Sequence, residues 1–226
     1  MIHIFDIDYT LIRKSTAYHF LLEAVTRKKI SLKQLGKLPL DWLHYKFGAI
    51  HFDFIEKALA HMAGIDESLI DETAESCFKR RLRRNVYREG ARLVRRIQDE
   101  GGEAVLATSS FYNLVRPLEN FLGVKESLAS RLEFENGKTT GRIDGKALFG
   151  ANKKEAVEDW LKKRSIPLQD VWFYSDSYTD LPLLSVVGHP VAVNPDRFLR
   201  KKARQNKWRI LQFRELLVGE ACRTTS

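Results

Sequence analysis

Four short apolar segments, each rich in β-branched or aromatic residues, stop abruptly at polar residues. They lie at Ile2–Phe5, Ala104–Ala107, Val171–Tyr174 and Val191–Val193. Segments that are apolar on both faces are typical of parallel strands covered by helices on both sides. The pattern therefore predicts four buried strands of one parallel sheet.

Helical patterns separate these strands. Residues 92–100 place apolar side chains on one helical face and end at Gly101-Gly102, a frequent helix stop. Residues 153–163 also carry apolar side chains at helical spacing. This alternation predicts an α/β protein with a Rossmann-like open parallel sheet, in which ligands bind outside the carboxyl ends of the strands.

Two segments interrupt the alternation. Residues 14–86 have helical patterning and no convincing strand, so we predict a helical cap domain inserted after the first strand. Residues 1–13 and 87–226 would then form the α/β core. Within residues 131–145, alternating side chains lead into Asn136-Gly137, which predicts a β-hairpin.

Composition sets broad limits on the function. The 226 residues, 44% of them hydrophobic, can bury an ordinary core without disulfides or a structural metal. Lys and Arg number 38 against 29 Asp and Glu, which gives a net charge of +9. Nucleic acid, an anionic membrane surface and phosphorylated ligands are all compatible with this charge.

The cellular compartment is also suggested by the sequence. Cys77 and Cys222 are too few for a disulfide framework and lack the spacing of a zinc site. There is neither an apolar run of membrane-spanning length nor an N-terminal segment patterned like a signal peptide. We therefore expect a cytoplasmic protein.

Asp6 and Asp8 directly follow the first predicted strand. In an extended chain, residues i and i+2 face the same side, roughly 6.5–7 Å apart. Two carboxylates placed there repel each other unless they share a cation or a proton, and Mg²⁺ binds such oxygen ligands together with substrate phosphates. An Asp can also attack phosphorus while its neighbour acts as acid and base. The alternative is a pair of solvated acids in a turn.

A second acidic cluster, Asp176 and Asp180, follows the third predicted strand. Asp176 is placed to supply a further carboxylate to a metal site. Asp180 could bind a metal-bound water or position Lys153. The alternative for one of them is a helix N-cap, because Asp is common at that position.

Hydroxyl residues and a lysine complete the set of candidates. Thr108 and Ser109 follow the second strand and precede a predicted helix, where hydroxyls and free backbone N–H groups suit a phosphate. An ordinary N-cap is the alternative. Lys153 could supply the fixed positive charge that phosphoryl transfer requires.

Together these motifs resemble those of the haloacid dehalogenase superfamily. The resemblance lies in the DxDxT motif that starts at Asp6, in the hydroxyl residue Thr108, in Lys153 and in the acidic segment 174–180. The position of the cap is similar to that in the phosphoserine phosphatase-like subfamily. The resemblance implies a phosphatase that acts through an aspartyl-phosphate on a small phosphorylated metabolite.

The resemblance also implies a role for each matched residue. Asp6 would be the nucleophile and Asp8 the general acid and base. Mg²⁺ would be held by Asp6, the backbone carbonyl of Asp8, and Asp176. Thr108, Ser109 and Lys153 would bind the phosphoryl group, with Asp180 in support; Lys154 competes with Lys153, but the spacing from Gly150 favours Lys153.

One position departs from the subfamily. Ser15 stands where phosphoserine phosphatases have a Glu that binds the substrate ammonium. Because a buried ammonium without a carboxylate partner is costly, this departure argues against phosphoserine as the substrate.

Two basic runs, at residues 79–84 and 197–209, leave other functions open. We interpret them as solvated helical faces that attract anionic substrate toward the site. Helix-turn-helix and RNA-binding signatures are absent, which disfavours nucleic acid; contact with a membrane surface is not favoured either. The alternatives are a phosphatase for a phospholipid headgroup and a non-catalytic anion-binding module. The sequence does not indicate an oligomeric state.

Overall fold

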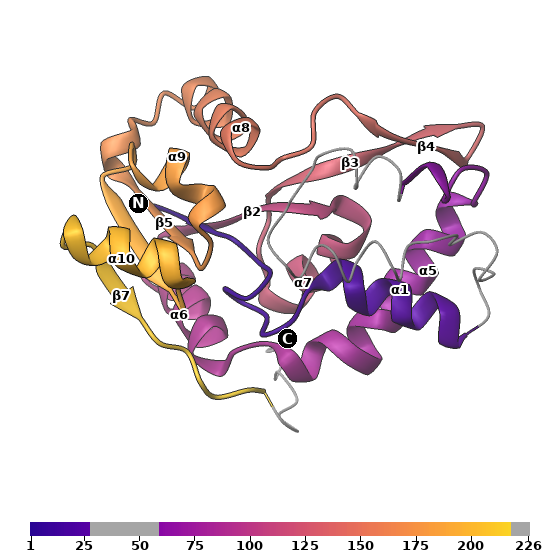
Figure 1. Cartoon of the computed structure of the whole chain (residues 1–226), viewed down its shortest axis with the longest axis horizontal. Coiled ribbons are helices and arrows are strands. Elements are labelled where there is room, and N and C mark those ends of the chain that lie inside the picture. The colour runs from indigo at the N-terminus through magenta and orange to yellow at the C-terminus, as the bar shows by residue number, and fades with distance from the viewer. Residues whose placement is uncertain (28–58, 218–226) are drawn as a thin grey trace.

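The computed structural model describes residues 1–27 and 59–217 (Figure 1). Seven strands form one sheet in the order β4-β3-β2-β1-β5-β6-β7. They are β1 (Ile2–Phe5), β2 (Glu103–Phe111), β3 (Ser127–Glu135), β4 (Lys138–Asp144), β5 (Val171–Ser175), β6 (His189–Val193) and β7 (Arg209–Leu211). Every neighbouring pair is parallel except β3 with β4. The predicted α/β class with a mainly parallel open sheet is confirmed.

Helices cover both faces of this sheet (Figure 1). They are α1 (Thr16–Thr26), α5 (Glu67–Cys77), α6 (Arg88–Asp99), α7 (Tyr112–Leu122), α8 (Ala151–Lys163), α9 (Leu181–Leu184) and α10 (Arg197–Gln205). The short helical turns are η1 (Phe78–Leu82), η2 (Arg83–Asn85), η3 (Leu168–Asp170) and η4 (Tyr178–Asp180). In the described part of the chain, none of these helices has the length and apolar character needed to cross a membrane.

The central strand β1 divides the core into two layers. Phe5 belongs to the buried cluster that includes residues of α6 and α7. Ile2 and Ile4 belong to the cluster on the other face, with α8, α9 and α10. This alternation follows from the two-residue period of a strand, and the three buried residues of β1 are all apolar.

The segment predicted as a cap is mainly helical in its described parts. Residues 14–27 and 59–86 contain α1, α5, η1 and η2, and residues 28–58 lie outside the described residues. Phe20 of α1 and Ile70 of α5 join the same buried cluster as Phe5. The division into cap and core remains a prediction.

Two predicted boundaries are wrong. β2 continues to Phe111, so Thr108 and Ser109 lie within the strand and not at the start of a helix. Buried Thr108 accepts a hydrogen bond from the Ser110 backbone (3.2 Å), and the register with β3 shifts at this point. The basic run 197–209 is not one helix either, because α10 ends at Gln205 and Arg209 lies in β7.

The predicted hairpin is confirmed, and its second strand is hydrogen-bonded to residues 64 and 65 of the segment predicted as a cap. Asn136 and Gly137 both have positive φ angles, 51° and 74°, as a tight hairpin turn requires. The Gly64 N–H donates to the Thr139 carbonyl (2.7 Å), and the Thr139 N–H donates to the Ile65 carbonyl (2.9 Å). The edge strand β4 is thereby hydrogen-bonded to the residues just before α5.

A methyl group at Gly141 should disrupt this contact. A Cβ there would lie 2.9 Å from the Leu59 carbonyl oxygen and 3.0 Å from the Ala60 Cα, and the φ of +76° already disfavours other residues. We expect Gly141→Ala to lower the free energy of unfolding by about 2–4 kcal/mol in urea titrations. Gly145→Ala is the control, because it has a φ of +77° but open space around it. Equal losses in both variants would contradict the packing explanation.

Candidate active site

The candidate residues meet at the carboxyl edge of the sheet. Phe5 is level with Leu106 of β2 and Tyr174 of β5 in the parallel ladders. The next residue, Asp6, is buried, and its N–H donates to the Tyr174 carbonyl (2.9 Å). Asp6 after β1 and Asp176 after β5 therefore share one rim with the part of β2 beyond Leu106, which includes Thr108.

Lys153 joins two of the predicted acids. Its Nζ donates to Asp6 Oδ1 at 2.8 Å and lies 2.8 Å from Asp180 Oδ1. Lys153 is buried in the first turn of α8, whereas Lys154 pairs with Glu158 on the helix surface (3.5 Å). Of the two candidate lysines, only Lys153 lies at the acidic rim.

Asp180 is held from both sides. Besides Lys153, it accepts a hydrogen bond from the Ser175 hydroxyl (2.7 Å), which in turn accepts one from the Ser177 N–H (3.1 Å). Asp180 stands at the N-cap position of α9, but its side chain makes no capping hydrogen bond. Its carboxylate therefore binds Lys153 and does not cap α9.

Asp176 is tied to the loop after β1 through Thr10. The Thr10 hydroxyl lies 3.2 Å from Asp176 Oδ1 and accepts a hydrogen bond from the Asp176 N–H at 2.9 Å. Between Asp8 and Thr10, Tyr9 adopts a positive φ of 60°, which turns the chain sharply after the strand. The loop and the end of β5 are thus fixed relative to each other.

Asp8 binds the start of α1 rather than the lysine. The Thr16 N–H donates to Asp8 Oδ1 at 3.0 Å and its hydroxyl to Oδ2 at 3.3 Å. That hydroxyl also contacts the hydroxyl of Ser110 in β2. Ser15, where a Glu is expected from the family pattern, accepts a hydrogen bond from the Tyr18 N–H (3.4 Å) as the N-cap of α1.

The two predicted phosphate-binding hydroxyls differ in their surroundings. Thr108 is buried in β2, whereas Ser109 is exposed and its carbonyl accepts a hydrogen bond from Ser130 (3.1 Å). No described contact joins either side chain to Asp6 or Lys153. Ser110, which the sequence did not single out, is the residue of this segment that contacts the site through Thr16.

Burial dominates the acid–base properties of the rim. It raises the pKa of Asp6, with Lys153 opposing the shift and the charges of Asp180 and Asp8 adding to it. Burial, followed by the negative charges of Asp6 and Asp180, raises the pKa of Asp176 well above 3.8. Burial alone would lower the pKa of Lys153, but the two carboxylates outweigh it and raise the pKa. Lys153 therefore stays protonated, and the raised pKa values of the acids mean that ionising all of them together is unfavourable with this one cation.

A divalent cation would relieve the repulsion among the ionised carboxylates. In the described part of the chain, no set of three His, Cys, Asp or Glu side chains forms a metal-binding cluster. Mg²⁺ does not require one, because it typically takes one or two protein carboxylates and completes its shell with waters and substrate oxygens. Asp6 and Asp176 are a suitable pair, because the charge of Asp6 raises the pKa of Asp176.

A model of the haloacid dehalogenase-like hydrolase family matches residues 4–185. This chain belongs to that family. A phosphoserine phosphatase of Mycobacterium tuberculosis is 31% identical over 215 residues, covering 93% of this chain and 70% of the relative. The histidinol-phosphatase of Neisseria meningitidis is 27% identical and covers 93% and 98% of the two chains. The prediction of a haloacid dehalogenase-like phosphatase is confirmed.

A solved structure shares this fold along nearly the whole chain. A Bordetella pertussis protein of unknown function superposes with a TM-score of 0.82 at 26% identity, covering 93% of this chain and 97% of the other. The sequence prediction missed contacts through the hydroxyl residues Thr10, Thr16 and Ser175. Thr10 and Ser175 border the acidic motifs, which was the available signal for them, whereas Thr16 lies eight residues beyond Asp8.

The buried carboxylate of Asp8 should make stability depend on pH. Burial raises its pKa from 3.8 to about 6, although hydrogen bonds from Thr16 oppose the shift. Between about pH 4 and 6 the folded protein keeps a proton that the unfolded chain has lost, so stability falls as the pH rises. Buried Asp6 and Asp176 also have raised pKa values and contribute to the decline. We therefore expect Asp8→Asn to make the decline shallower and to be more stable than the wild type at pH 7 by about 1–2 kcal/mol.

Urea unfolding at a series of pH values, without divalent cations, measures the effect. Asp170→Asn is the control, because that exposed carboxylate precedes β5 and has no burial cost to relieve. A wild-type decline that persists unchanged in Asp8→Asn would contradict the assignment to Asp8.

Proposed function

We propose that this protein is a Mg²⁺-dependent phosphomonoester hydrolase that works through an aspartyl-phosphate on Asp6. The observation that supports the proposal most directly is the buried contact of Lys153 with Asp6 at 2.8 Å. A permanently charged ammonium beside a carboxylate places a phosphate-binding cation next to a nucleophile. Family membership gives the hydrolase chemistry, and the contact supports Asp6 and Lys153 as residues that carry it out.

Asp6 begins the reaction by attacking phosphorus with one carboxylate oxygen. The bond between phosphorus and the ester oxygen breaks, and Asp8 donates a proton to the departing alkoxide. A pKa raised to about 6 by burial lets Asp8 hold that proton near neutral pH. Lys153 neutralises charge on the phosphoryl oxygens, and Thr108 and Ser109 would contact the same group from β2.

Water completes the cycle. Asp8, now a carboxylate, accepts a proton from a water molecule that attacks the phosphorus of the intermediate. The Asp6–phosphorus bond breaks, inorganic phosphate is released and Asp8 is protonated again. Asp180 takes no part in bond making; its contacts with Lys153 and Ser175 position the lysine.

Asp6, Asp176 and the backbone carbonyl of Asp8 would hold Mg²⁺. The ion would offset repulsion between the carboxylates and the incoming phosphate and orient the phosphoryl group. Thr10 positions Asp176 for this task through its paired hydrogen bonds.

The proposed substrate is a small phosphorylated metabolite. The relatives are named for phosphoserine and histidinol phosphate, both monoesters of compact amino alcohols. Ser15 supplies an N-cap hydroxyl and no carboxylate for a substrate ammonium. We therefore consider phosphoserine a less suitable substrate than monoesters that are recognised without a carboxylate at position 15. A protein without a described membrane-spanning helix is compatible with the cytoplasmic location proposed for this activity.

Replacing the nucleophile tests the reaction. Asp6→Asn preserves the shape of the side chain but removes the attacking carboxylate, so we expect hydrolysis of p-nitrophenyl phosphate with Mg²⁺ to fall by at least about 10³-fold. Wild-type activity in a folded Asp6→Asn variant would refute the proposal.

Two controls accompany this measurement. Asp170→Asn removes an exposed carboxylate at the opposite end of β5 and should retain full activity. Chelation of divalent cations should abolish wild-type activity, and added Mg²⁺ should restore it; full activity after exhaustive chelation would exclude the metal-dependent mechanism.

The absence of an acid at position 15 predicts a substrate preference. With no carboxylate there, the ammonium of phosphoserine adds no binding energy, so its kcat/KM should not exceed that of glycerol phosphate. Steady-state kinetics on both esters measures the ratio. A phosphoserine kcat/KM more than about tenfold higher would mean that another group binds the ammonium.

A further inference from the structure

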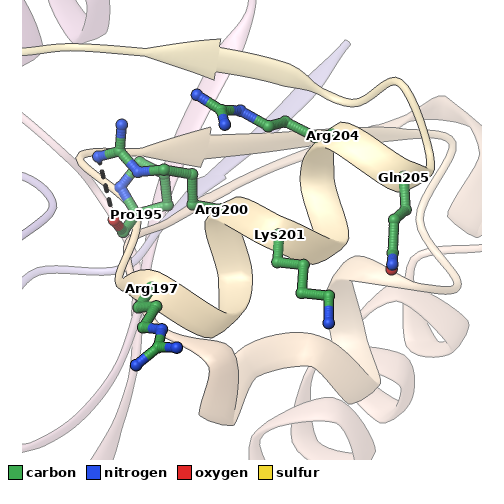
Figure 2. A pocket seen from close by; sticks show the side chains of 6 residues that line it. All are labelled: Pro195, Arg197, Arg200, Lys201, Arg204 and Gln205. Atoms are coloured by element: carbon green, nitrogen blue, oxygen red, sulfur yellow. Dashed lines mark hydrogen bonds between the residues drawn. The ribbon is translucent and has the colours of Figure 1, made fainter.

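A basic groove lies on α10, outside the candidate active site. Arg197 lies three and four residues before Arg200 and Lys201, and Arg204 lies four and three residues after them. This spacing places the four cations along one side of the helix. With Pro195 and Gln205 they line a shallow groove of about 650 Å³ (Figure 2). This surface presents four cations within two helical turns.

The charge on this surface is not neutralised within the described residues. None of the four cations makes an ion pair there; Arg200 only donates to the Pro195 carbonyl (3.4 Å). The neighbouring acid, Asp196, accepts hydrogen bonds from the N–H groups of Leu199 (2.8 Å) and Tyr178 (2.6 Å). The cations are therefore available to an anionic partner.

The opposite side of α10 is fixed in the core. Leu199 and Ala203 are fully buried, so the basic side is held outward. Near the start of the helix, Phe198 is 65% exposed and Tyr178 of η4 is 45% exposed. Their ring centroids lie 5.9 Å apart. An exposed aromatic pair thus stands beside the cations.

We propose that α10, together with Tyr178 and Phe198, is a docking surface for membranes that contain anionic lipids. Cations beside exposed aromatic side chains suit the interface of such a membrane, where the cations meet lipid phosphates and the rings enter the headgroup layer.

The arrangement of the side chains favours an extended anionic surface over a single phosphate. Figure 2 shows the cationic side chains spreading apart from the outer side of the helix instead of converging on one point. It also disfavours a polynucleotide, because Tyr178 and Phe198 pack against each other at 54° instead of presenting open parallel faces to bases.

The docking surface is connected to the candidate site. The Asp196 N–H donates to the Asp176 carbonyl (2.8 Å), and Asp196 accepts from Tyr178, two residues farther along the same loop. Docking through α10 would therefore place the loop that carries Asp176 and Asp180 beside the lipid headgroups.

Vesicle flotation tests the proposal with the full chain. We expect the wild type to float with phosphatidylcholine vesicles that contain about 30% phosphatidylglycerol, and not with pure phosphatidylcholine. Arg197→Glu combined with Lys201→Glu should weaken the binding to anionic vesicles at least about tenfold.

The matched control is Arg92→Glu combined with Arg95→Glu. These exposed arginines lie on α6, which packs on the other face of the sheet, and their replacement changes the net charge by the same amount. We expect this control to bind within about twofold of the wild type. Equal weakening in both variants would show that only net charge matters and would overturn the proposal.

Phe198→Ala tests the contribution of the inserted aromatic ring separately from that of the cations. It leaves every cation in place, and we expect it to weaken vesicle binding about three- to tenfold through lost apolar contact. Unchanged vesicle binding of this variant would overturn the proposal. So would a wild type that does not float with anionic vesicles, or one that binds a single-stranded oligonucleotide more tightly than the vesicles. Circular dichroism confirms that each variant is folded.

Discussion

A buried ammonium shared by two carboxylates holds the candidate site together. Lys153 reaches Asp6 and Asp180 from α8, and these partners belong to the end of β1 and to the turn before α9. Removing one partner of such a buried pair leaves an uncompensated charge, which typically costs about 3–5 kcal/mol. The relative positions of three separate chain segments therefore depend on one side chain.

The same contact explains how a basic protein can have an acidic centre. One ammonium faces Asp6 and Asp180, while Asp176 and Asp8 lie close by with only hydroxyl and N–H donors as partners. The net charge of +9 resides elsewhere, much of it on α10 and on the run 79–84. Arg81 of that run binds buried Glu23 of α1 (2.6 Å), so part of this positive charge stabilises the cap segment and is not free in solvent.

The sequence was informative where local pattern and final environment agree. Apolar runs that end at Asp6 and Ser175 predicted the strands and the rim, and Asn136-Gly137 predicted the hairpin. It was misleading where tertiary contacts satisfy polar groups. Thr108 and Ser109 were expected beyond the end of the strand, yet both lie in β2, where the Thr108 hydroxyl and the Ser109 carbonyl accept hydrogen bonds. The partners of Thr16 could not be predicted either, because they lie 8 and 94 residues away.

The position of β1 in the sheet has a consequence for the order in which the protein assembles. This strand pairs with β2 from residue 103 and with β5 from residue 171. The first ladder therefore cannot close until nearly half of the chain has left the ribosome, and the second until about three quarters of it has. The contact between Lys153 and Asp6 spans 147 residues of sequence. Contacts of such long range slow folding, because a large loop must close before they form. During synthesis the first strand therefore stays unpaired while its partners are made, and the candidate nucleophile is among the last groups to reach its native surroundings.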